Sequence, residues 1–289
     1  MQASLNHYCL SIPSVDHQVG QEAARYLDTL TKPKGSLGRL EAIAVQLATI
    51  TGQVKPRVSP PGIIVFAADH GVAEEGVSAY PQEVTAQMVR NFLQGGAAIN
   101  VFARQIGALL EVVDVGVAQP LEASGLVSRK VRYGTANFLK EPAMSQEEAV
   151  AAIEAGIERA EALIKRGIKS LIVGEMGIGN TTASSAMLAA AKHRIPVIAD
   201  GFICTVAALL AVKLCPRVSD VLLAGHRSQE PGHQVALSLL DKEPLLDLGM
   251  RLGEGSGAAV AFPLVEAACR MIGEMATFQE AGVTEGGER

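Results

Sequence analysis

Beyond residue 50, short apolar runs alternate with longer stretches in which apolar residues recur at helical spacing. The short runs are apolar on both faces, which is typical of strands that are covered on both sides. The five expected strands comprise residues 63–68, 109–113, 171–173, 197–199 and 221–224. The expected helices between them comprise residues 83–95, 97–106, 145–166, 181–193, 202–214 and 232–240.

This alternation predicts an α/β fold with an open, doubly wound parallel sheet, because parallel neighbours are joined by right-handed helical crossovers. A closed α/β barrel is the second interpretation, and it is disfavoured because it needs about eight such units. Before residue 50 the chain shows only helical spacing, in residues 21–30 and 37–50, with a break at residues 32–35.

Polar side chains stand next to glycine at the carboxyl ends of all five expected strands: Asp69, Asp114, Glu175, Asp200 and His226. In a parallel sheet these ends lie at one edge, where α/β proteins bind their ligands. A single such residue is often only a helix cap, but five in register indicate a site. We therefore expect Glu175, Asp200 and His226 to contact a substrate.

Residues 173–182 combine a strand, a glycine-rich turn and the start of a helix. Unpaired N–H groups at such a helix start, together with the helix dipole, favour a phosphate. Gly177, Gly179, Asn180 and Thr181 are therefore candidate phosphate-binding residues. The segment lacks the lysine of a Walker A loop and the spacing of a dinucleotide fingerprint, and a well-capped helix after a tight turn would give the same pattern.

Glu254 lies between Gly253 and Gly255, ahead of an expected helix at residues 258–272. A partly desolvated carboxylate has a raised pKa and can act as a general base near neutral pH. The alternative is a loop glutamate that is favoured only by the dipole of the following helix.

The loop after the first expected strand begins with Asp69-His70-Gly71 and continues to Tyr80. An Asp–His pair suggests a metal site, but no second His or Cys lies at a suitable spacing, so no metal is expected. We expect this loop to form a lid or pocket wall in which Tyr80 offers a flat face to an aromatic ring.

Composition excludes several classes of function. The 289-residue chain has 25 Lys and Arg against 30 Asp and Glu, without a basic stripe, so a nucleic-acid partner is not expected. Four cysteines without a CxxC pair argue against a disulfide framework or structural zinc and favour the cytoplasm. No signal peptide, transmembrane helix or membrane partner is expected, and residues 206–212 are the most membrane-like stretch.

Five motifs occur in a fixed order, in residues 31–41, 68–71, 174–182, 200–202 and 250–259. Together they resemble the nicotinate-nucleotide–dimethylbenzimidazole phosphoribosyltransferase family, from about residue 20 to residue 277. The resemblance implies a Rossmann-like sheet domain in residues 51–257, a small helical domain built from residues 1–50 and 258–289, and a homodimer.

The resemblance also implies a transfer that needs neither a metal nor a cofactor. A ring nitrogen of 5,6-dimethylbenzimidazole attacks C1′ of nicotinate mononucleotide, nicotinate leaves, and α-ribazole 5′-phosphate forms with inversion for cobalamin assembly. Glu254 matches the family's general base and Glu175 a second active-site carboxylate. The turn that contains Gly177, Gly179, Asn180 and Thr181 matches the phosphate site, and the residues that match the benzimidazole pocket are Tyr80, Met88 and Leu252.

The chain departs from the family pattern in two places. Lys34 stands where the family usually has a second proline. Between Met187 and Lys192 the family usually carries several tens of further residues, including a strand and a lysine that helps to hold the phosphate. Two alternatives to an active transferase therefore remain: a shortened, catalytically impaired paralogue that binds an azole base, and an unrelated, metal-requiring α/β hydrolase-type enzyme that uses Asp69 or Asp200.

Overall fold

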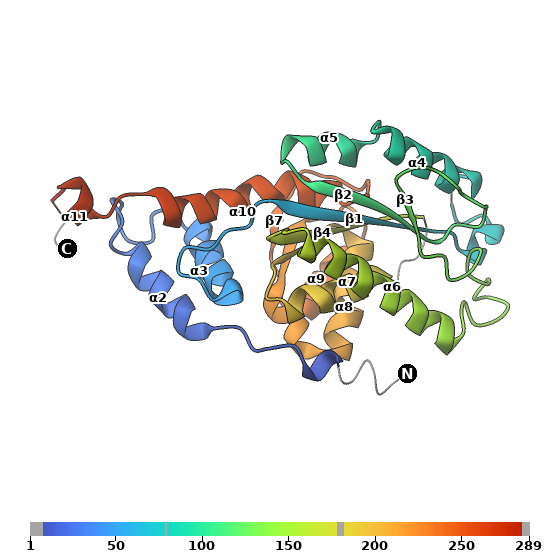
Figure 1. Cartoon of the computed structure of the whole chain (residues 1–289), viewed down its shortest axis with the longest axis horizontal. Helices are drawn as coiled ribbons and strands as arrows, with labels where there is room; N and C mark the ends of the chain where they lie inside the picture. The colour runs from blue at the N-terminus through green and yellow to red at the C-terminus, as the bar shows by residue number, and fades with distance from the viewer. Residues whose placement is uncertain (1–7, 79, 178–181, 285–289) are drawn as a thin grey trace.

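The computed structural model describes residues 8–78, 80–177 and 182–284. Its centre is a seven-stranded sheet in the order β3-β2-β1-β4-β5-β6-β7, and every neighbouring pair is parallel (Figure 1). The strands are β1 (Pro61–Ala68), β2 (Leu109–Gly116), β3 (Leu126–Ser128), β4 (Ser170–Met176), β5 (Val197–Ala199), β6 (Leu222–His226) and β7 (Pro244–Leu246).

The doubly wound α/β prediction is confirmed, because the five expected strands are present as β1, β2, β4, β5 and β6. The sheet is open, with β3 and β7 at its edges, so the barrel interpretation is wrong. The sequence pattern does not predict β3 or β7, because each is a three-residue edge strand that is only partly buried, whereas the equally short β5 is fully buried inside the sheet.

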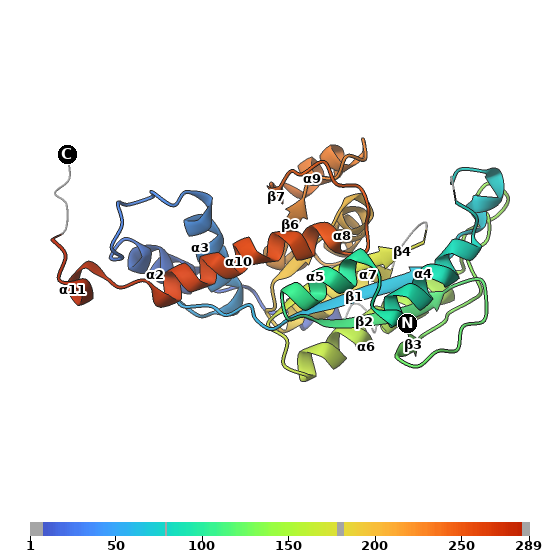
Figure 2. The ribbon, with the colours of Figure 1, turned by 90° about the horizontal axis from the view of Figure 1, so that it is seen from above.

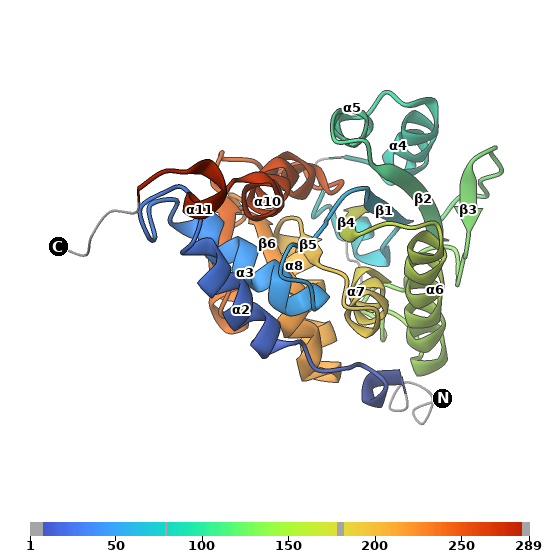
Figure 3. The same cartoon turned by 60° about the vertical axis from the view of Figure 1, so that its left-hand side comes forward.

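Helices cover both faces of the sheet (Figure 3). One face carries α4 (Glu83–Gln94), α5 (Ala98–Gln105) and α10 (Ser256–Glu274). The other carries α6 (Gln146–Lys165), α7 (Thr182–Lys192) and α8 (Phe202–Leu214), and α9 (His233–Leu240) packs against α8. Short 3-10 helices lie at η1 (Gly71–Glu75) and η2 (Pro216–Val221). Because both faces are covered, β1 is buried along its whole length, as its apolar sequence requires.

Helices from the N-terminal and C-terminal parts of the chain lie together beyond the amino edge of the sheet (Figure 2). Helices α2 (His17–Leu27) and α3 (Arg39–Thr51) pack with α10, and Phe278 N, at the start of α11 (Phe278–Ala281), donates to Thr29 O at 2.9 Å. Since α10 also packs on β4 and β6, it belongs to both parts of the molecule. The division into a domain of residues 51–257 and one of residues 1–50 and 258–289 stays a prediction.

Helix α10 is long and apolar enough to span a membrane by length and composition alone, with a mean hydropathy of 1.2. The expectation that residues 206–212 are the most membrane-like stretch is therefore wrong. However, 56% of α10 is buried inside the protein. Its apolar composition is accounted for by its position between the sheet and α3.

The first turn of α10 packs directly on the end of β6. A Cβ atom added to Gly257 would lie 1.9 Å from Cδ2 of His226, so only glycine fits there. By contrast, a Cβ atom added to Gly273, near the other end of the same helix, would have nothing within 4 Å.

Replacing these two glycines should have opposite effects on stability. Gly257→Ala should lower the free energy of unfolding by about 1–3 kcal/mol through overpacking. Gly273→Ala should leave it unchanged or raise it by up to about 1 kcal/mol, as expected for an open helical position. Urea unfolding of both variants checks this, and a Gly257→Ala protein as stable as Gly273→Ala would contradict the packing.

Candidate functional site

The order of the strands reverses beside β1, because the chain runs from β1 to β2 and β3 on one side and then crosses to β4 on the other. Such a switch point leaves a crevice at the carboxyl ends of the two strands. A pocket of about 240 Å³ lies there. It is lined by Asp69, His70, Ala73, Ser78, Tyr80, Pro81, Gln82, Val84, Thr85, Glu175, Met176, Gly177, Ile203 and Leu252.

Four of the predicted site residues line this pocket together: Tyr80, Glu175, Gly177 and Leu252. They come from the loop after β1, the end of β4 and the loop before α10. Tyr80 and Leu252 are 72% and 57% exposed, so both offer apolar surface that a bound ring would cover.

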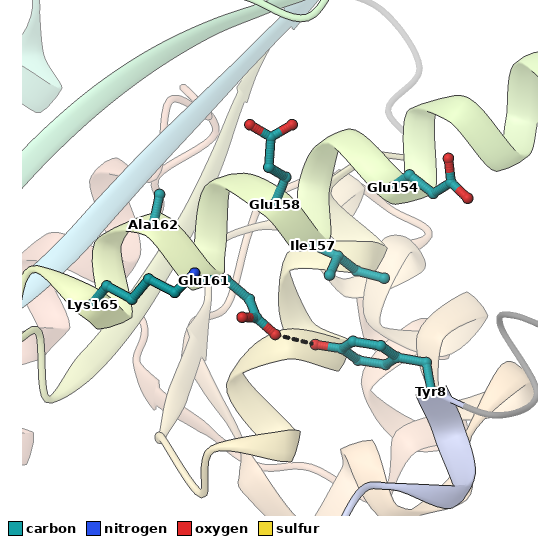
Figure 4. A pocket seen from close by; sticks show the side chains of 7 residues that line it. All are labelled: Tyr8, Glu154, Ile157, Glu158, Glu161, Ala162 and Lys165. Carbon is teal, nitrogen blue, oxygen red and sulfur yellow. Dashed lines mark hydrogen bonds between the residues drawn. The ribbon is translucent and has the colours of Figure 1, made fainter.

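A larger pocket of about 450 Å³ lies elsewhere, between Tyr8 and α6 (Figure 4). Its wall carries the carboxylates of Glu154, Glu158 and Glu161, and Tyr8 Oη donates to Glu161 at 3.1 Å. Because these carboxylates would repel a phosphate, this pocket does not suit a nucleotide. The crevice at the switch point is the candidate site because four of the predicted site residues meet there.

Glu254 is buried beside β4, with an exposed fraction of 5%. Its N–H donates to Glu175 O at 3.2 Å, and its Oε2 accepts from Ile99 N at 3.4 Å. Its φ of +65° lies in the left-handed region, where a non-glycine residue costs about 1 kcal/mol or more. Burial raises the pKa of Glu254, and the charge of Asp200 raises it further, whereas the Ile99 amide opposes the shift.

Glu175 is the other predicted carboxylate, and it is buried at the end of β4. A Cβ atom on Gly253 would lie 2.7 Å from its Oε1, so the loop before α10 passes directly over this carboxylate. Glu175 and Glu254 therefore stand on two backbone segments in direct contact. Glu175 lines the pocket, whereas Glu254 is not among the lining residues.

Asp200 holds the start of α10 and does not line the pocket. Its two oxygens accept from Gly255 N at 3.1 Å and Ala258 N at 2.9 Å, and His226 Nε2 lies 3.6 Å from Oδ1. Burial raises the pKa of Asp200, while the amides and His226 oppose the shift. The geometry shows a structural role for Asp200 and His226, and their contact with a substrate stays a prediction.

Asp69 and Asp114 also accept bonds from the backbone. Asp69 Oδ2 accepts from Ala118 N at 2.8 Å, although Asp69 also lines the pocket. Asp114 Oδ1 accepts from Val117 N at 2.9 Å, and its Oδ2 pairs with Lys130 Nζ at 2.8 Å. Three of the five strand-end residues thus bind backbone amides: Asp200 caps the start of α10, whereas Asp69 and Asp114 bind amides of the loop after β2.

The remaining predicted residues are Met88 and three residues of the expected phosphate site. Met88, on α4, is partly buried against the core and does not line the pocket. Gly179, Asn180 and Thr181 lie outside the described residues, although the segment that contains them starts at Gly177 in the pocket wall. Their role as a phosphate site stays a prediction.

His70 lines the pocket, as part of the loop that is expected to form a lid or pocket wall, although the sequence predicts no ligand role for His70 itself beyond a disfavoured metal site. The part of the chain that the structure describes holds no group of three or more His, Cys, Asp or Glu side chains that could bind a metal ion. His70 follows the end of β1, which is one of the two strands at the switch point. This position in the sequence is what could have identified it as a pocket residue.

Comparison with known proteins identifies the family. A phosphoribosyltransferase family model matches residues 12–190 and 185–283. The chain belongs to this family. It is 45% identical to a nicotinate-nucleotide–dimethylbenzimidazole phosphoribosyltransferase of Halalkalibacterium halodurans, over 95% of each chain, and 45% identical to that of Chloroflexus aggregans, over 98% of this chain and 97% of the relative. The crystal structure of this enzyme from Thermus thermophilus matches with a TM-score of 0.86 and 43% identity, over 94% of this chain and 100% of the other.

The comparisons also locate the missing segment. The two matches to the family model meet at residues 185–190, within α7. The alignment with the Halalkalibacterium halodurans relative has 338 positions, whereas 95% of 289 residues is about 275, so some 60 positions have no counterpart here. Helix α7 instead joins β4 directly to β5, and Leu171 pairs with Val197.

The raised pKa of Glu254 predicts a pH-dependent effect of Glu254→Gln on stability. The native protein retains this proton at a pH at which the unfolded chain has lost it. Wild-type stability therefore falls as pH rises from about 4.3, the ordinary glutamate pKa, through the higher native value. The variant has no such proton, so its stability relative to wild type should increase between about pH 4 and pH 8.

Urea unfolding across this pH range measures the difference. Glu274→Gln is the matched control on α10, since the side chain of Glu274 is 69% exposed and should show no such trend. A difference between Glu254→Gln and wild type that is constant with pH would contradict the burial of this carboxylate.

Proposed function

We propose that this chain transfers the 5-phosphoribosyl group of nicotinate mononucleotide to 5,6-dimethylbenzimidazole, which gives α-ribazole 5′-phosphate and nicotinate. The observation that carries this proposal is the pocket at the switch point, in which Glu175, Gly177, Tyr80 and Leu252 meet. Membership of the phosphoribosyltransferase family and the names of the relatives support it.

The proposed chemistry needs a base and a group that stabilises positive charge. The azole nitrogen forms a bond to C1′ as the bond from C1′ to nicotinate breaks, and the azole N–H proton goes to Glu254. Positive charge develops at C1′, and Glu175 would stabilise it. The raised pKa of Glu254 suits a general base, because it brings the group closer to neutral pH. No step of this scheme requires a metal ion or a cofactor.

The binding roles follow from the walls of the pocket. The exposed faces of Tyr80 and Leu252 would sandwich the benzimidazole, with Met88 nearby on α4. The turn that begins at Gly177 and continues through Gly179, Asn180 and Thr181 would hold the phosphate with its backbone amides. Asp200 and His226 would act at the end of the site nearest to α10.

Replacing the proposed base should abolish most of the activity. Glu254→Gln should lower the rate of nicotinate release from nicotinate mononucleotide and dimethylbenzimidazole by about two orders of magnitude or more, because general bases typically contribute that much. Chromatography of released nicotinate measures the rate. Glu274→Gln is the control and should retain the wild-type rate, and folded wild-type protein that forms no product would contradict the proposed function.

The alternative is a shortened paralogue that binds an azole base but is catalytically impaired. It is favoured by one observation, the absence of some 60 positions within α7, next to the proposed phosphate turn. Calorimetry separates the two functions. Binding of both substrates supports the transferase, whereas binding of dimethylbenzimidazole without nicotinate mononucleotide supports the paralogue.

We further propose that the protein is a cytoplasmic homodimer. Its four cysteines are free thiols, as a reducing compartment requires. Exposed apolar side chains line one side of α8, at Val206, Leu210 and Leu214, and one side of the adjacent α9, at Val235 and Leu239. Apolar stripes of this kind mark protein interfaces.

Light scattering tests the oligomeric state. The 30.2 kDa chain should have a solution mass of about twice that value. A Leu210→Glu, Leu239→Glu double variant should be monomeric, because each charge would be buried without a partner in the interface. A wild-type protein that is monomeric at micromolar concentration would contradict the proposal.

A further inference from the structure

The pocket contains a histidine with one bonded and one unbonded ring nitrogen. His70 lines the pocket, and its Nδ1 lies 3.4 Å from Thr135 Oγ1. Its Nε2 is shielded from solvent and has no hydrogen-bond partner in the parts of the chain that the structure describes. A buried polar atom without a partner is costly, so in a binding pocket it indicates a group that the ligand completes.

The loop at residues 134–137 fixes the position of His70. Thr135 N donates to Asp69 O at 3.0 Å, and Thr135 Oγ1 accepts from Gly71 N at 3.3 Å. A Cβ atom on Gly71 would lie 2.5 Å from Asn137 N, so the backbone after His70 packs directly against this loop. The backbone on both sides of His70 is therefore held against this loop, and the imidazole contacts the loop through Nδ1.

The bonds of Thr135 bear on which ring nitrogen carries the proton. The Thr135 hydroxyl has one proton and lies 3.0 Å from Ala136 O, to which it can donate. When this bond is made, Thr135 Oγ1 can only accept from His70, and in that arrangement the proton lies on Nδ1 and Nε2 keeps its lone pair. Burial lowers the pKa of His70 to about 4, so the ring is neutral at neutral pH.

We propose that His70 Nε2 is a fixed hydrogen-bond acceptor that orients a substrate in the pocket by binding one of its N–H or O–H groups. This inference rests on the proposed function, whose two substrates offer such donors in the ribose hydroxyls and the azole N–H. The azole has only one N–H, so an azole that donates to His70 could not at the same time donate to Glu254, and that outcome of the test would reassign the proposed base. The adjacent Asp69 also lines the pocket, and its Oδ2 accepts from Ala118 N.

The test is calorimetry on the full-length chain with three probes: dimethylbenzimidazole, its N-methyl derivative and nicotinate mononucleotide. His70→Phe keeps a ring and removes the acceptor, so the substrate that donates the bond should bind about three- to tenfold more weakly. The other substrate should bind unchanged. His70→Gln, whose amide oxygen can accept a hydrogen bond, should restore most of the lost affinity.

The N-methyl derivative distinguishes the two sources of the donor. If the azole donates, wild type should bind the derivative about as weakly as His70→Phe binds the parent base. If a ribose hydroxyl donates, the loss in His70→Phe should appear with nicotinate mononucleotide, and both bases should bind as in wild type. Equal affinities of wild type and His70→Phe for all three probes would overturn the proposal.

Nitrogen-15 spectroscopy of the assigned histidines provides a second test that does not depend on the folding of a variant. A His70 ring protonated at Nδ1 supports the proposal, and a ring protonated at Nε2 overturns it. Nicotinate release is measured separately. Wild-type protein that binds both substrates but releases no nicotinate would refute the proposed reaction while leaving the hydrogen bond to His70 in place.

Discussion

The close approach of the segment before α10 to the end of β4 is the constraint on which the candidate site depends. A Cβ atom on Gly174 would lie 2.3 Å from Glu254 O, so no side chain fits between the two segments. Asp200 holds the same segment from the other side by accepting from Gly255 N and Ala258 N. Together these contacts fix the backbone of Glu254 against that of Glu175, with the left-handed conformation of Glu254 as their cost.

Most of the fold could be predicted from the sequence, because buried parallel strands give a strong signal. Strands β1, β2, β4, β5 and β6 are apolar runs between helical stretches, and they need no tertiary information to be recognised. Strands β3 and β7 could not be predicted, because a strand of three residues at a sheet edge forms only through its neighbour. Register and strand order likewise depend on packing that a single sequence does not show.

The location of the site could be predicted from the sequence, but the role of each residue in it could not. The rule that ligands bind at the carboxyl ends of parallel strands predicts Glu175 and Gly177 in the pocket. Tyr80 is expected there from its place in the loop after β1, and Leu252 only from the family resemblance. The same rule could not separate a pocket carboxylate from one that accepts backbone amides, such as Asp200, since both have the same sequence pattern. Thr135 contacts the Nδ1 atom of His70 and is 65 residues away in the sequence. No local motif could therefore reveal that Nε2 is the ring nitrogen without a partner among the described residues.

The missing segment after β4 has different consequences for the fold and for the candidate site. A parallel crossover needs only one helix of suitable length, so β4 and β5 still pair through α7, which packs against α6 and α8. The fold is therefore complete without the segment. Ligand contacts, by contrast, come from the loops at the carboxyl edge, and any loop carried by a missing unit is lost with it. Tyr80 and Leu252 stand on other loops and Glu175 ends β4 itself, so we expect the loss to fall on the proposed phosphate end of the site, after Gly177, and to spare the proposed azole end.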